Sequence, residues 1–355
     1  MKALVLSGGL GTRLRPFSYS MPKQLIPIVN KPVLEHVLEN VRRVGVTEVG
    51  IIVSDRAPQI RAVIGDGSRL GLRVTYIRQD EPLGLAHCVT LAREFLGDDD
   101  FVMFLGDNML PDGVEEIAQE FIDNRPAAQI VVRKVADPRA FGVVELGLDG
   151  RVERLVEKPE NPRSDLALVG VYFFTPAIHQ AASAISASAR GELEITDALQ
   201  WLVTQGAQVV ASQYDGYWKD TGHADDVLDC NRKLLQAVVA SVRGDVDESS
   251  VLIGSVVVEE GARVTGSRIE GPVIIGAGTL VEDSHIGPNT SIGRDCVLSY
   301  TRLDSSIVLD GATVTEVRGL HGSLIGRMAS IGPADVGTSH HRLVVGDHAR
   351  IEVAA

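Results

Sequence analysis

The sequence contains few cysteines, and those present show no pairing pattern. The 355 residues include three cysteines, which are odd in number, far apart and outside any Cys-x-x-Cys motif. Disulfide frameworks and structural zinc sites both need paired or clustered cysteines. We therefore expect reduced thiols and a reducing compartment, the cytoplasm.

A surplus of basic residues is also missing. Lys and Arg together number 34 against 47 Asp and Glu, which gives a formal net charge of −13. A protein that binds a nucleic-acid polymer needs a basic stripe, so this composition argues against that class and we expect no nucleic-acid partner. It does not exclude a nucleotide, because a local cluster of cations and backbone N–H groups can hold a triphosphate in an acidic protein.

Long hydrophobic runs are scarce. The apolar run at the N-terminus is too short for the core of a signal peptide. Residues 166–189 lack Asp, Glu, Lys and Arg and are long enough to cross a bilayer. The same stretch contains Pro176, His179, Gln180 and several serines, which favours a buried strand followed by a helix. We expect no membrane partner.

Up to about residue 240, short β-rich runs alternate with helical ones, and the chain length predicts two domains. Such alternation is typical of a doubly wound α/β sheet with mostly parallel strands. A helix is expected to begin at Pro32 and to end at Gly45. The turn at 148–151 predicts a hairpin, so the sheet is expected to be mixed. The other expected strands are 3–6, 49–53, 74–77, 101–105 and 130–135.

After about residue 245 the helical period disappears and a 17-residue repeat replaces it. Three inward-facing aliphatic residues in each coil are typical of a parallel β-helix of the hexapeptide type, and the sequence resembles the left-handed form. The expected domains are therefore residues 1–240 and 245–355. The three aliphatic series are Leu252, Ile269, Ile286, Leu303 and Leu320; Val258, Ile275, Ile292 and Leu309; and Val264, Val281 and Leu298.

The first expected strand leads into a glycine-rich turn, Ser7-Gly8-Gly9-Leu10-Gly11-Thr12-Arg13-Leu14-Arg15. Glycines at a strand end let the backbone approach phosphates and direct its N–H groups at them. The spacing excludes a GxGxxG dinucleotide loop, because position 14 is Leu, and it excludes a P-loop, because no Gly-Lys-Ser/Thr follows. Arg13, Arg15 and Lys23 add three cations, so the segment predicts a polyanion site.

Residues 6–16, followed by Pro22-Lys23-Gln24-Leu25-Ile26-Pro27 and Asn30-Lys31-Pro32, resemble the signature of the sugar nucleotidyltransferases. The Lys23-Gln24 pair is most similar to the glucose-1-phosphate thymidylyltransferase branch. The resemblance covers residues 1–240, and the added β-helix points to the long form of that branch. Further matching stretches, in order, are Gly84-Leu85-Ala86, Leu105-Gly106-Asp107-Asn108, Glu157-Lys158-Pro159, Gly191-Glu192-Leu193-Glu194-Ile195-Thr196-Asp197 and Trp218-Lys219-Asp220-Thr221-Gly222.

The resemblance implies a Rossmann-like nucleotidyltransferase sheet followed by a C-terminal left-handed β-helix. The implied reaction transfers a deoxythymidylyl group from dTTP to glucose 1-phosphate and gives dTDP-glucose and pyrophosphate. The sugar phosphate is already an anion, so it attacks the α-phosphorus in line without a general base or a covalent nucleophile. Catalysis then depends on positioning and charge neutralisation. His36, His87 and His223 are accordingly interpreted as helix or loop residues.

The resemblance also implies a role for each site residue. Asp107 and Asp220 would hold Mg²⁺ at strand ends, on the ligand-binding edge of the sheet. Arg13 and Lys23 would neutralise the phosphates that leave as pyrophosphate, and Lys158 would hold the sugar phosphate. Arg190 would assist Lys158, or it is a solvated loop residue. Gln79 and the backbone at Gly84 would read the pyrimidine.

The two implied binding sets are these. The nucleotide would be bound by Leu6, Gly8, Gly9, Gly11, Thr12, Arg13, Lys23, Gln79 and Gly84. The sugar phosphate would be bound by Asn108, Gly142, Glu157, Lys158, Val169 and Arg190.

Other functions stay open at this point. Shorter relatives carry Gln at the position of His87, near the base, and a methyl contact discriminates by only about 1–3 kcal/mol, so a uridylyltransferase is one alternative. Left-handed β-helices often carry acyltransferases, and this one contains His285, His321, His340 and His341, but few cations to line a channel for CoA. A sugar-nucleotide sensor without turnover would be expected to lose the pair of metal carboxylates. The flat faces and end of the β-helix predict a homo-oligomer.

Overall fold

The computed structural model describes residues 1–333 and 348, which form two compact units. The first unit comprises Met1–Leu10, Met21–Leu25 and Val33–Asp220, and the second comprises Gly11–Ser20, Ile26–Pro32 and the described residues from 221 onward. Two short N-terminal segments thus belong with the C-terminal part of the chain. The expected linear division into residues 1–240 and 245–355 stays a prediction.

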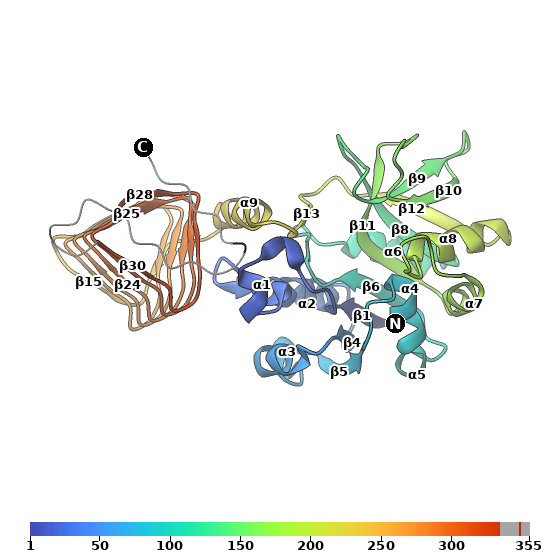
Figure 1. Ribbon diagram of the computed structural model, residues 1–355, viewed down its shortest axis with the longest axis horizontal. Helices are drawn as coiled ribbons and strands as arrows, with labels where there is room; N and C mark the ends of the chain where they lie inside the picture. The colour runs from blue at the N-terminus through green and yellow to red at the C-terminus, as the bar shows by residue number, and fades with distance from the viewer. Residues whose placement is uncertain (334–347, 349–355) are drawn as a thin grey trace. The chain divides into compact units, whose positions relative to one another are not determined.

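A mixed nine-stranded sheet forms the centre of the first unit (Figure 1). Its main path runs β10-β9-β11-β6-β1-β4-β5, and β8 joins β11 to β12 beside that path. Strands β5, β4, β1 and β6 are parallel, whereas β11 is antiparallel to its neighbours β6, β8 and β9. The strands are β1 (Lys2–Leu6), β4 (Glu48–Val53), β5 (Arg73–Arg78), β6 (Phe101–Leu105), β8 (Ala128–Lys134), β9 (Gly142–Leu146), β10 (Val152–Glu157), β11 (Leu166–Phe174) and β12 (Val209–Gln213).

The expected elements of this unit are confirmed. All five expected strands are present, and the turn at 148–151 joins β9 to β10 as an antiparallel hairpin. The helix after Pro32 spans Val33–Arg43, and Gly45 follows it with a φ of 88°. The uncharged stretch 166–189 forms the fully buried strand β11 and then a helix. No helix among the described residues is long and apolar enough to cross a membrane.

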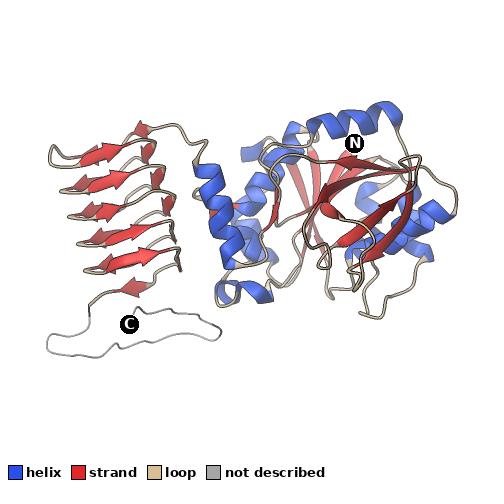
Figure 2. Ribbon diagram, turned by 90° about the horizontal axis from the view of Figure 1, so that it is seen from above, coloured by secondary structure: helices blue, strands red, loops and turns tan. Residues whose placement is uncertain are grey.

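Helices cover both faces of the sheet (Figure 2). Apolar side chains of α4, α5, α7 and α8 pack on one face and those of α2, α3 and α6 on the other. The helices are α2 (Val33–Arg43), α3 (Ala57–Ile64), α4 (Leu85–Leu91), α5 (Arg93–Leu96), α6 (Glu115–Asn124), α7 (Ala177–Ala184) and α8 (Ile195–Thr204), with short 3-10 turns at Lys23–Leu25 and Ser68–Leu70.

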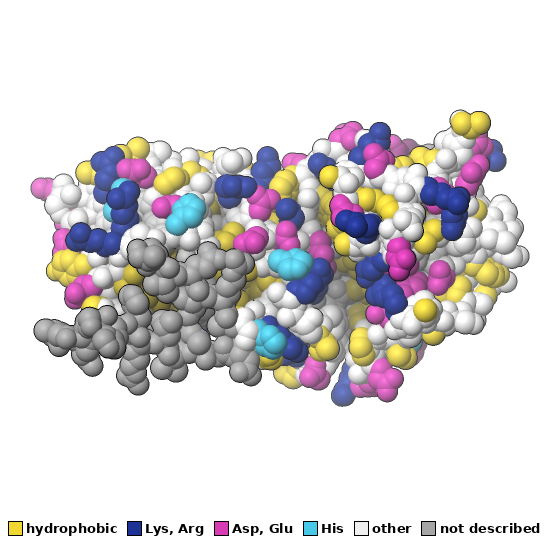
Figure 3. All heavy atoms as spheres, turned by 45° about the horizontal axis from the view of Figure 1, so that its top comes forward, with side chains coloured by type: hydrophobic (Ala, Val, Ile, Leu, Met, Phe, Trp, Pro, Cys, Tyr) yellow, Lys and Arg dark blue, Asp and Glu magenta, His cyan; other side chains and the backbone are white. Residues whose placement is uncertain are grey.

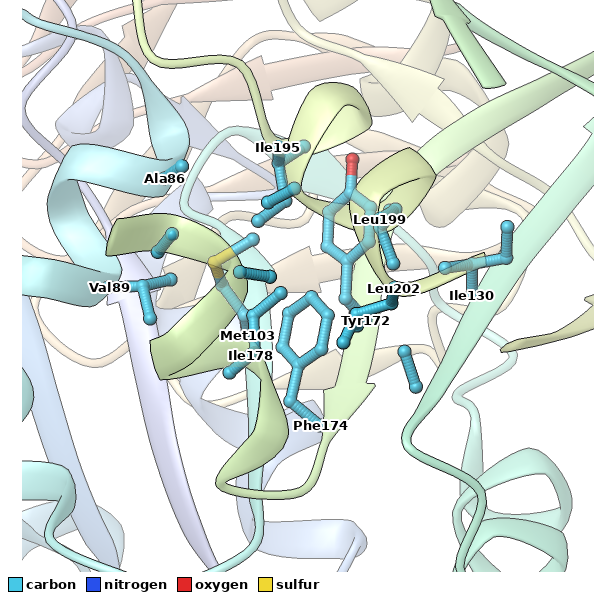
Figure 4. Packing of buried hydrophobic residues seen from close by; sticks show 14 of the residues in the cluster. Ala86, Val89, Met103, Ile130, Tyr172, Phe174, Ile178, Ile195, Leu199 and Leu202 are labelled. Atoms are coloured by element: carbon cyan, nitrogen blue, oxygen red, sulfur yellow. The ribbon is translucent and has the colours of Figure 1, made fainter. Parts of the chain in front are cut away.

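Aromatic and aliphatic side chains fill the first of these two cores, as Figure 4 shows. The rings of Tyr172 and Phe174 are stacked, with centroids 5.9 Å apart, and Met103, Leu199 and Leu202 surround them. Burial of this apolar surface is the main stabilising term of the sheet and keeps the strand ends in fixed positions.

The second unit contains the expected parallel β-helix, whose coils stack as layers in Figure 2. Three parallel sheets of six, six and five strands make its faces, consistent with the left-handed type. The sheets are β14 (Ser241–Val242), β17 (Val256–Val258), β20 (Val273–Ile275), β23 (Thr290–Ile292), β26 (Ile307–Val308) and β29 (Leu324–Ile325); β15 (Asp245–Val246), β18 (Arg263–Thr265), β21 (Leu280–Glu282), β24 (Val297–Ser299), β27 (Thr313–Thr315) and β30 (Ser330–Ile331); and β16 (Val251–Ile253), β19 (Arg268–Glu270), β22 (His285–Ile286), β25 (Arg302–Asp304) and β28 (Arg318–His321).

The 17-residue register is confirmed except in one coil. The series from Leu252 to Leu320 pairs as expected, but Ile292 pairs with Val308 instead of Leu309. The coil is one residue shorter there, and Ser305 takes a φ of 49° in the turn. A bulge in the next sheet restores the register at Leu320. His340 and His341 lie outside the described residues.

Two N-terminal segments and a helix complete the second unit. The N-terminal elements are a 3-10 turn (Thr12–Leu14), α1 (Phe17–Ser20), β2 (Pro27–Ile28) and β3 (Lys31–Pro32), and the helix is α9 (Ala224–Leu235). Val29 packs with Leu235, Val257 and Ile274 in a small apolar cluster. The side chain of Asn30 donates a hydrogen bond to the carbonyl of Ile292 at 2.7 Å.

Candidate active site

The candidate residues of the first unit gather where the parallel strands end. Strands β1, β5 and β6 are followed directly by Ser7-Gly8-Gly9, Gln79 and Gly106-Asp107. The chain leaves β1 toward β4 on one side and returns to β6 on the other, so the glycine-rich turn lies where the strand order reverses. In open α/β sheets this position binds ligands.

Asp107 is held from two sides. Lys23 forms an ion pair with its Oδ2, and Asn108 donates to its Oδ1 at 3.2 Å. Asn108 is itself buried, and its own oxygen accepts a hydrogen bond from the indole N–H of Trp218 at 2.7 Å. The carboxylate therefore has a fixed orientation at the end of β6.

The backbone of Asp220 pairs with the residue that follows Asp107. The short strand β13 (Lys219–Asp220) pairs antiparallel with β7 (Asn108–Met109), and Asp220 is opposite Asn108. Asp107 thus lies directly before one strand of this pair and Asp220 ends the other, and their joint role as metal ligands stays a prediction. The described part of the chain has no cluster of three or more His, Cys, Asp or Glu able to hold a metal. Two carboxylates suit Mg²⁺, which takes few protein oxygens and completes its shell with phosphates and water.

Gly8 and Gly9 leave room for polar side chains. A Cβ on Gly8 would be 2.9 Å from Gln79 Oε1, and one on Gly9 would be 3.5 Å from Lys23 Cε. Gln79 is buried, and its Nε2 lies 3.2 Å from His87 Nδ1. The glycine-rich turn therefore meets both the predicted base-reading residue and the predicted phosphate-binding lysine, beyond the end of the buried Leu6.

Gly84 has a backbone that only glycine adopts readily. Its φ is 101° and its ψ is 173°, and it precedes the first turn of α4. A Cβ there would lie 2.4 Å from the carbonyl oxygen of Leu193. Hydrogen bonds from Leu193 to Leu83 and from Ala86 to Leu193 fix this close approach.

A second cluster forms around Glu157 at the end of β10. Its Oε1 lies 3.3 Å from Arg190 and 3.4 Å from Lys158, and its Oε2 accepts from the hydroxyl of Thr196 at 3.3 Å. Gly142 pairs with Glu157 across the hairpin, and a Cβ on Gly142 would lie 3.2 Å from that carboxylate. The structure thus brings four of the predicted sugar-phosphate residues together.

The remaining two members of that set connect the clusters. Val169 is buried in β11, which lies between β6 and β9 in the sheet. The next residue, Gly170, has a φ of 81°, and its missing Cβ leaves space for Asn108 Nδ2. Both clusters therefore lie on one sheet, where β11 and β9 stand between β6 and β10.

A cavity of about 590 Å³ opens beside Glu157, and acidic groups line it. Its wall includes Arg190, Glu194, Asp197 and Gln200. Burial raises the pKa of Glu194, against a hydrogen bond from Ser188, and nearby Glu157 also raises it. Burial and Glu157 likewise raise the pKa of Asp197. Arg154 and Arg190 supply positive charge in the same wall, and Arg190 contacts Glu157, Glu192 and Glu194.

The other predicted nucleotide residues belong to the second unit. Gly11 has a φ of 64°, and Thr12 and Arg13 begin the 3-10 turn that follows it. The structure groups these residues with the second unit and not with Lys23 and Asp107, so the full predicted set is not assembled within one unit.

The contacts of four supporting residues were not predicted from the sequence. Trp218 fixes the amide of Asn108, Thr196 and Glu194 surround the Glu157–Arg190 pair, and His87 contacts Gln79. Three of the four lie in the matched motifs and His87 directly follows one, but a motif does not reveal which side chain contacts which.

Comparison with known proteins now decides the family. The nucleotidyl transferase family model matches residues 2–237. A glucose-1-phosphate thymidylyltransferase from Streptomyces griseus is 52% identical over 355 residues, which covers all of both chains. The chain belongs to the nucleotidyl transferase family. A low-salt glycan biosynthesis nucleotidyltransferase from Haloferax volcanii, Agl11, is 39% identical over 357 residues, covering 99% of this chain and all of that protein.

A solved structure shares the fold of this nucleotidyl transferase. The structure of a UDP-glucose pyrophosphorylase complexed with UDP-glucose superimposes with a TM-score of 0.61. It covers 66% of this chain and 98% of that chain at 23% sequence identity. The expected fold class, a mixed α/β nucleotidyltransferase sheet followed by a β-helix, is confirmed.

Proposed function

We propose that this nucleotidyl transferase moves a deoxythymidylyl group from dTTP to glucose 1-phosphate and forms dTDP-glucose and pyrophosphate. The observation that carries the proposal is the 52% identity, across the whole of both chains, to the Streptomyces griseus glucose-1-phosphate thymidylyltransferase. The pairing of Asp220 with Asn108, the neighbour of Asp107, and the ion pair of Asp107 with Lys23 support it, because these groups suit a bound triphosphate and metal.

Asp107 and Asp220 would hold Mg²⁺. When bound, the metal would neutralise phosphate charge and orient the α-phosphate. The chain's own contribution is orientation: Asn108 and Trp218 fix the Asp107 carboxylate before any ligand arrives. Lys23, which contacts Asp107, would turn its ammonium group toward the phosphates that leave as pyrophosphate. Arg13 would bind the same phosphates.

Glu157, Lys158 and Arg190 would bind glucose 1-phosphate. The cations would contact its phosphate and the carboxylate would accept hydrogen bonds from its hydroxyls, with Gly142, Val169 and Asn108 beside the sugar. In the structure Glu157 holds both cations, so the phosphate would take them over when it binds. The bound phosphate oxygen is an anion and attacks the α-phosphorus directly, so no side chain needs to accept a proton.

Gln79 and the backbone of Gly84 would contact the base, and the backbone from Leu6 to Thr12 would contact the triphosphate. The expected location remains the cytoplasm, which suits the three free cysteines. A homo-oligomer also remains our expectation, because the faces of a β-helix offer extended contact surfaces. Lys and Arg side chains lie among Asp and Glu on the face drawn in Figure 3, which suits the expectation of no nucleic-acid partner.

A pyrophosphate-release assay tests the proposal. Glucose 1-phosphate is offered with dTTP, UTP, dCTP, GTP or ATP in turn, with and without Mg²⁺. We expect dTTP to give the highest kcat/KM and to require the metal, with UTP as a weaker substrate. A clear preference for GTP or ATP would overturn the proposed base, and a preference for UTP would favour the uridylyltransferase alternative.

An additional acyltransferase activity has no specific support in the described part of the β-helix. His285 lies 3.4 Å from Glu270, and His321 lies 2.5 Å from Asp304, each as neighbours on one outer sheet. Each pair joins a histidine to a carboxylate of the adjacent coil.

A further inference from the structure

The two ends of the Gln79 amide face different surroundings. Gln79 directly follows β5, its backbone N–H donates to the carbonyl of Val53, and its side chain is buried. An amide has a donor end and an acceptor end, and a protein can use it to read a base only if its orientation is fixed. The neighbours of each end therefore decide what Gln79 presents to a ligand.

The nitrogen end faces two acceptors. Gln79 Nε2 lies 3.2 Å from His87 Nδ1, which accepts a hydrogen bond when the ring is neutral and its proton is on Nε2. The Cys88 thiol donates to the carbonyl of Gly84 at 3.5 Å, so its sulfur has only lone pairs to offer Gln79. Burial raises the pKa of Cys88 to about 12, against the hydrogen bond from Gln79, so this thiol keeps its proton.

The oxygen end faces the glycine-rich turn. A Cβ on Gly8 would lie only 2.9 Å from Oε1. Because residue 8 is glycine, the oxygen fits there without a clash. Among the described residues no side chain or backbone N–H donates to this oxygen. Oε1 is therefore an acceptor that is oriented by its partners at the other end and left open for a ligand.

We propose that His87 is a positioning residue that holds Gln79 with its carbonyl oxygen toward the base and so selects pyrimidines that carry an imide N–H. The inference rests on the proposed function, since it concerns the base of the triphosphate. Thymine and uracil carry an N–H group at N3, which can donate a hydrogen bond to Gln79 Oε1. Cytosine presents an acceptor at N3 and meets that oxygen with repulsion.

Two substitutions at His87 separate orientation from charge and packing. His87→Glu offers acceptors only, so Gln79 keeps its nitrogen on residue 87 and its oxygen toward the base. His87→Lys offers donors only, so the Gln79 oxygen turns to the lysine and its NH₂ group faces the base. Each variant changes charge near the triphosphate, but that effect is shared by all nucleotides and cancels in a ratio.

The experiment compares dUTP with dCTP, which differ only in the base edge that Gln79 would read. We expect the ratio of their kcat/KM values to fall by about 10- to 100-fold in His87→Lys and to stay near wild type in His87→Glu. Dissociation constants of both nucleotides, measured with Mg²⁺ and without sugar phosphate, give the same ratio where turnover is too low.

A second background isolates Gln79 as the intermediary. Gln79→Glu has acceptors at both ends, so adding His87→Lys to it should leave the ratio unchanged. An unchanged ratio in His87→Lys alone, or an equal fall in His87→Glu, overturns the inference. A wild-type enzyme that does not prefer dTTP and dUTP over dCTP instead overturns the proposed function, so the two failures are distinguishable.

Discussion

At the scale of single residues, charge placement at the end of β6 organises the site. Lys23 forms an ion pair with the Asp107 carboxylate. Asn108, itself held by Trp218, fixes the orientation of that carboxylate. A carboxylate held by an amide and a cation keeps one orientation, which a metal ligand needs. In the proposed function the Lys23–Asp107 pair would partly separate when metal and triphosphate bind, and the lysine would then follow the phosphates.

Asp107→Asn and Asp220→Asn should each lower kcat by at least about 100-fold, or about 2.7 kcal/mol in transition-state stabilisation. The amide keeps the shape of the side chain but removes the charge that the metal needs. Turnover against Mg²⁺ concentration and a melting curve would be measured for both. Asp123→Asn, an exposed carboxylate paired with Gln119, is the matched control and should have wild-type turnover. Near-normal turnover in either site variant would refute the two-carboxylate site.

Glu194 predicts a pH dependence of stability. Burial raises its pKa above the ordinary 4.5, so the folded state binds this proton more tightly than the unfolded chain. Its contribution to the free energy of unfolding is therefore greatest in acid and falls as pH rises from about 4.5 toward neutral.

Glu194→Gln should remove this loss, because the amide has no proton to release. The stability of the variant relative to wild type should therefore increase between roughly pH 4.5 and 7.5, measured by denaturant unfolding. Glu192→Gln, which removes a less buried carboxylate that also contacts Arg190, is the control. A relative stability of Glu194→Gln that stays flat or decreases over this range would contradict the assignment.

At the scale of elements, the turn before α4 depends on one glycine. Gly84 combines a φ of 101° with a backbone contact to Leu193, whereas Gly97 has a φ of 60° and open space around it. Gly97→Ala should cost about 1–3 kcal/mol from the backbone conformation alone. Gly84→Ala should cost clearly more and also raise KM for the nucleotide, because α4 must move. Equal melting temperatures for the two variants would show that the Leu193 contact does not matter.

The β-helix could be predicted from sequence because its signal is periodic. Inward aliphatic residues recur at a fixed step, and the register from Leu252 to Leu320 follows from counting. The shortened coil could not be predicted in this way, because Val308 and Leu309 are both aliphatic and both buried. Only the backbone turn at Ser305 decides which of them continues the series.

Sequence motifs indicated the residues of the candidate site but not the contacts between them. Motif order indicated Asp107, Asp220, Glu157 and Arg190, and strand ends explained why they could meet. The pairing of β13 with β7 and the contact of His87 with Gln79 could not be predicted from the sequence. These depend on how loops of different length close, which has no local signature.

At the scale of the whole molecule, the start of the chain is built into the second unit. Asn231 in α9 is buried, and its oxygen accepts from the backbone N–H of Val29 at 2.9 Å and from the hydroxyl of Ser291 at 2.7 Å. Its nitrogen donates to the carbonyl of Asn289 at 3.4 Å. One side chain thus connects the N-terminal segment, α9 and the coils. The segment that carries Gly11, Thr12 and Arg13 belongs to the same unit.

Truncation after residue 240 should therefore lower both stability and turnover without abolishing the reaction. It removes Ser291, Asn289 and Ile292 as partners of Asn231 and Asn30, and it exposes the apolar side chains of Val29 and Leu235. Lys23, Asp107, Lys158 and Asp220 stay in the first unit. A positioning segment displaced by about 1 Å can cost about 100-fold in rate, so we expect a loss of roughly 10- to 100-fold.

Asn231→Ala in the full chain is the companion variant, because it breaks the same connection and leaves every coil in place. It should lower the melting temperature, since Val29 loses a buried partner at a cost of about 1–3 kcal/mol, and it should reduce turnover less than truncation. Asn124→Ala, which removes an exposed hydrogen bond to Glu120, should change neither.

Size-exclusion chromatography of each variant would report any change of oligomeric state. A truncated chain that folds but has no turnover would mean that the coils complete the active site, and a full-length protein that acetylates an amino sugar from acetyl-CoA would mean that they carry an activity of their own.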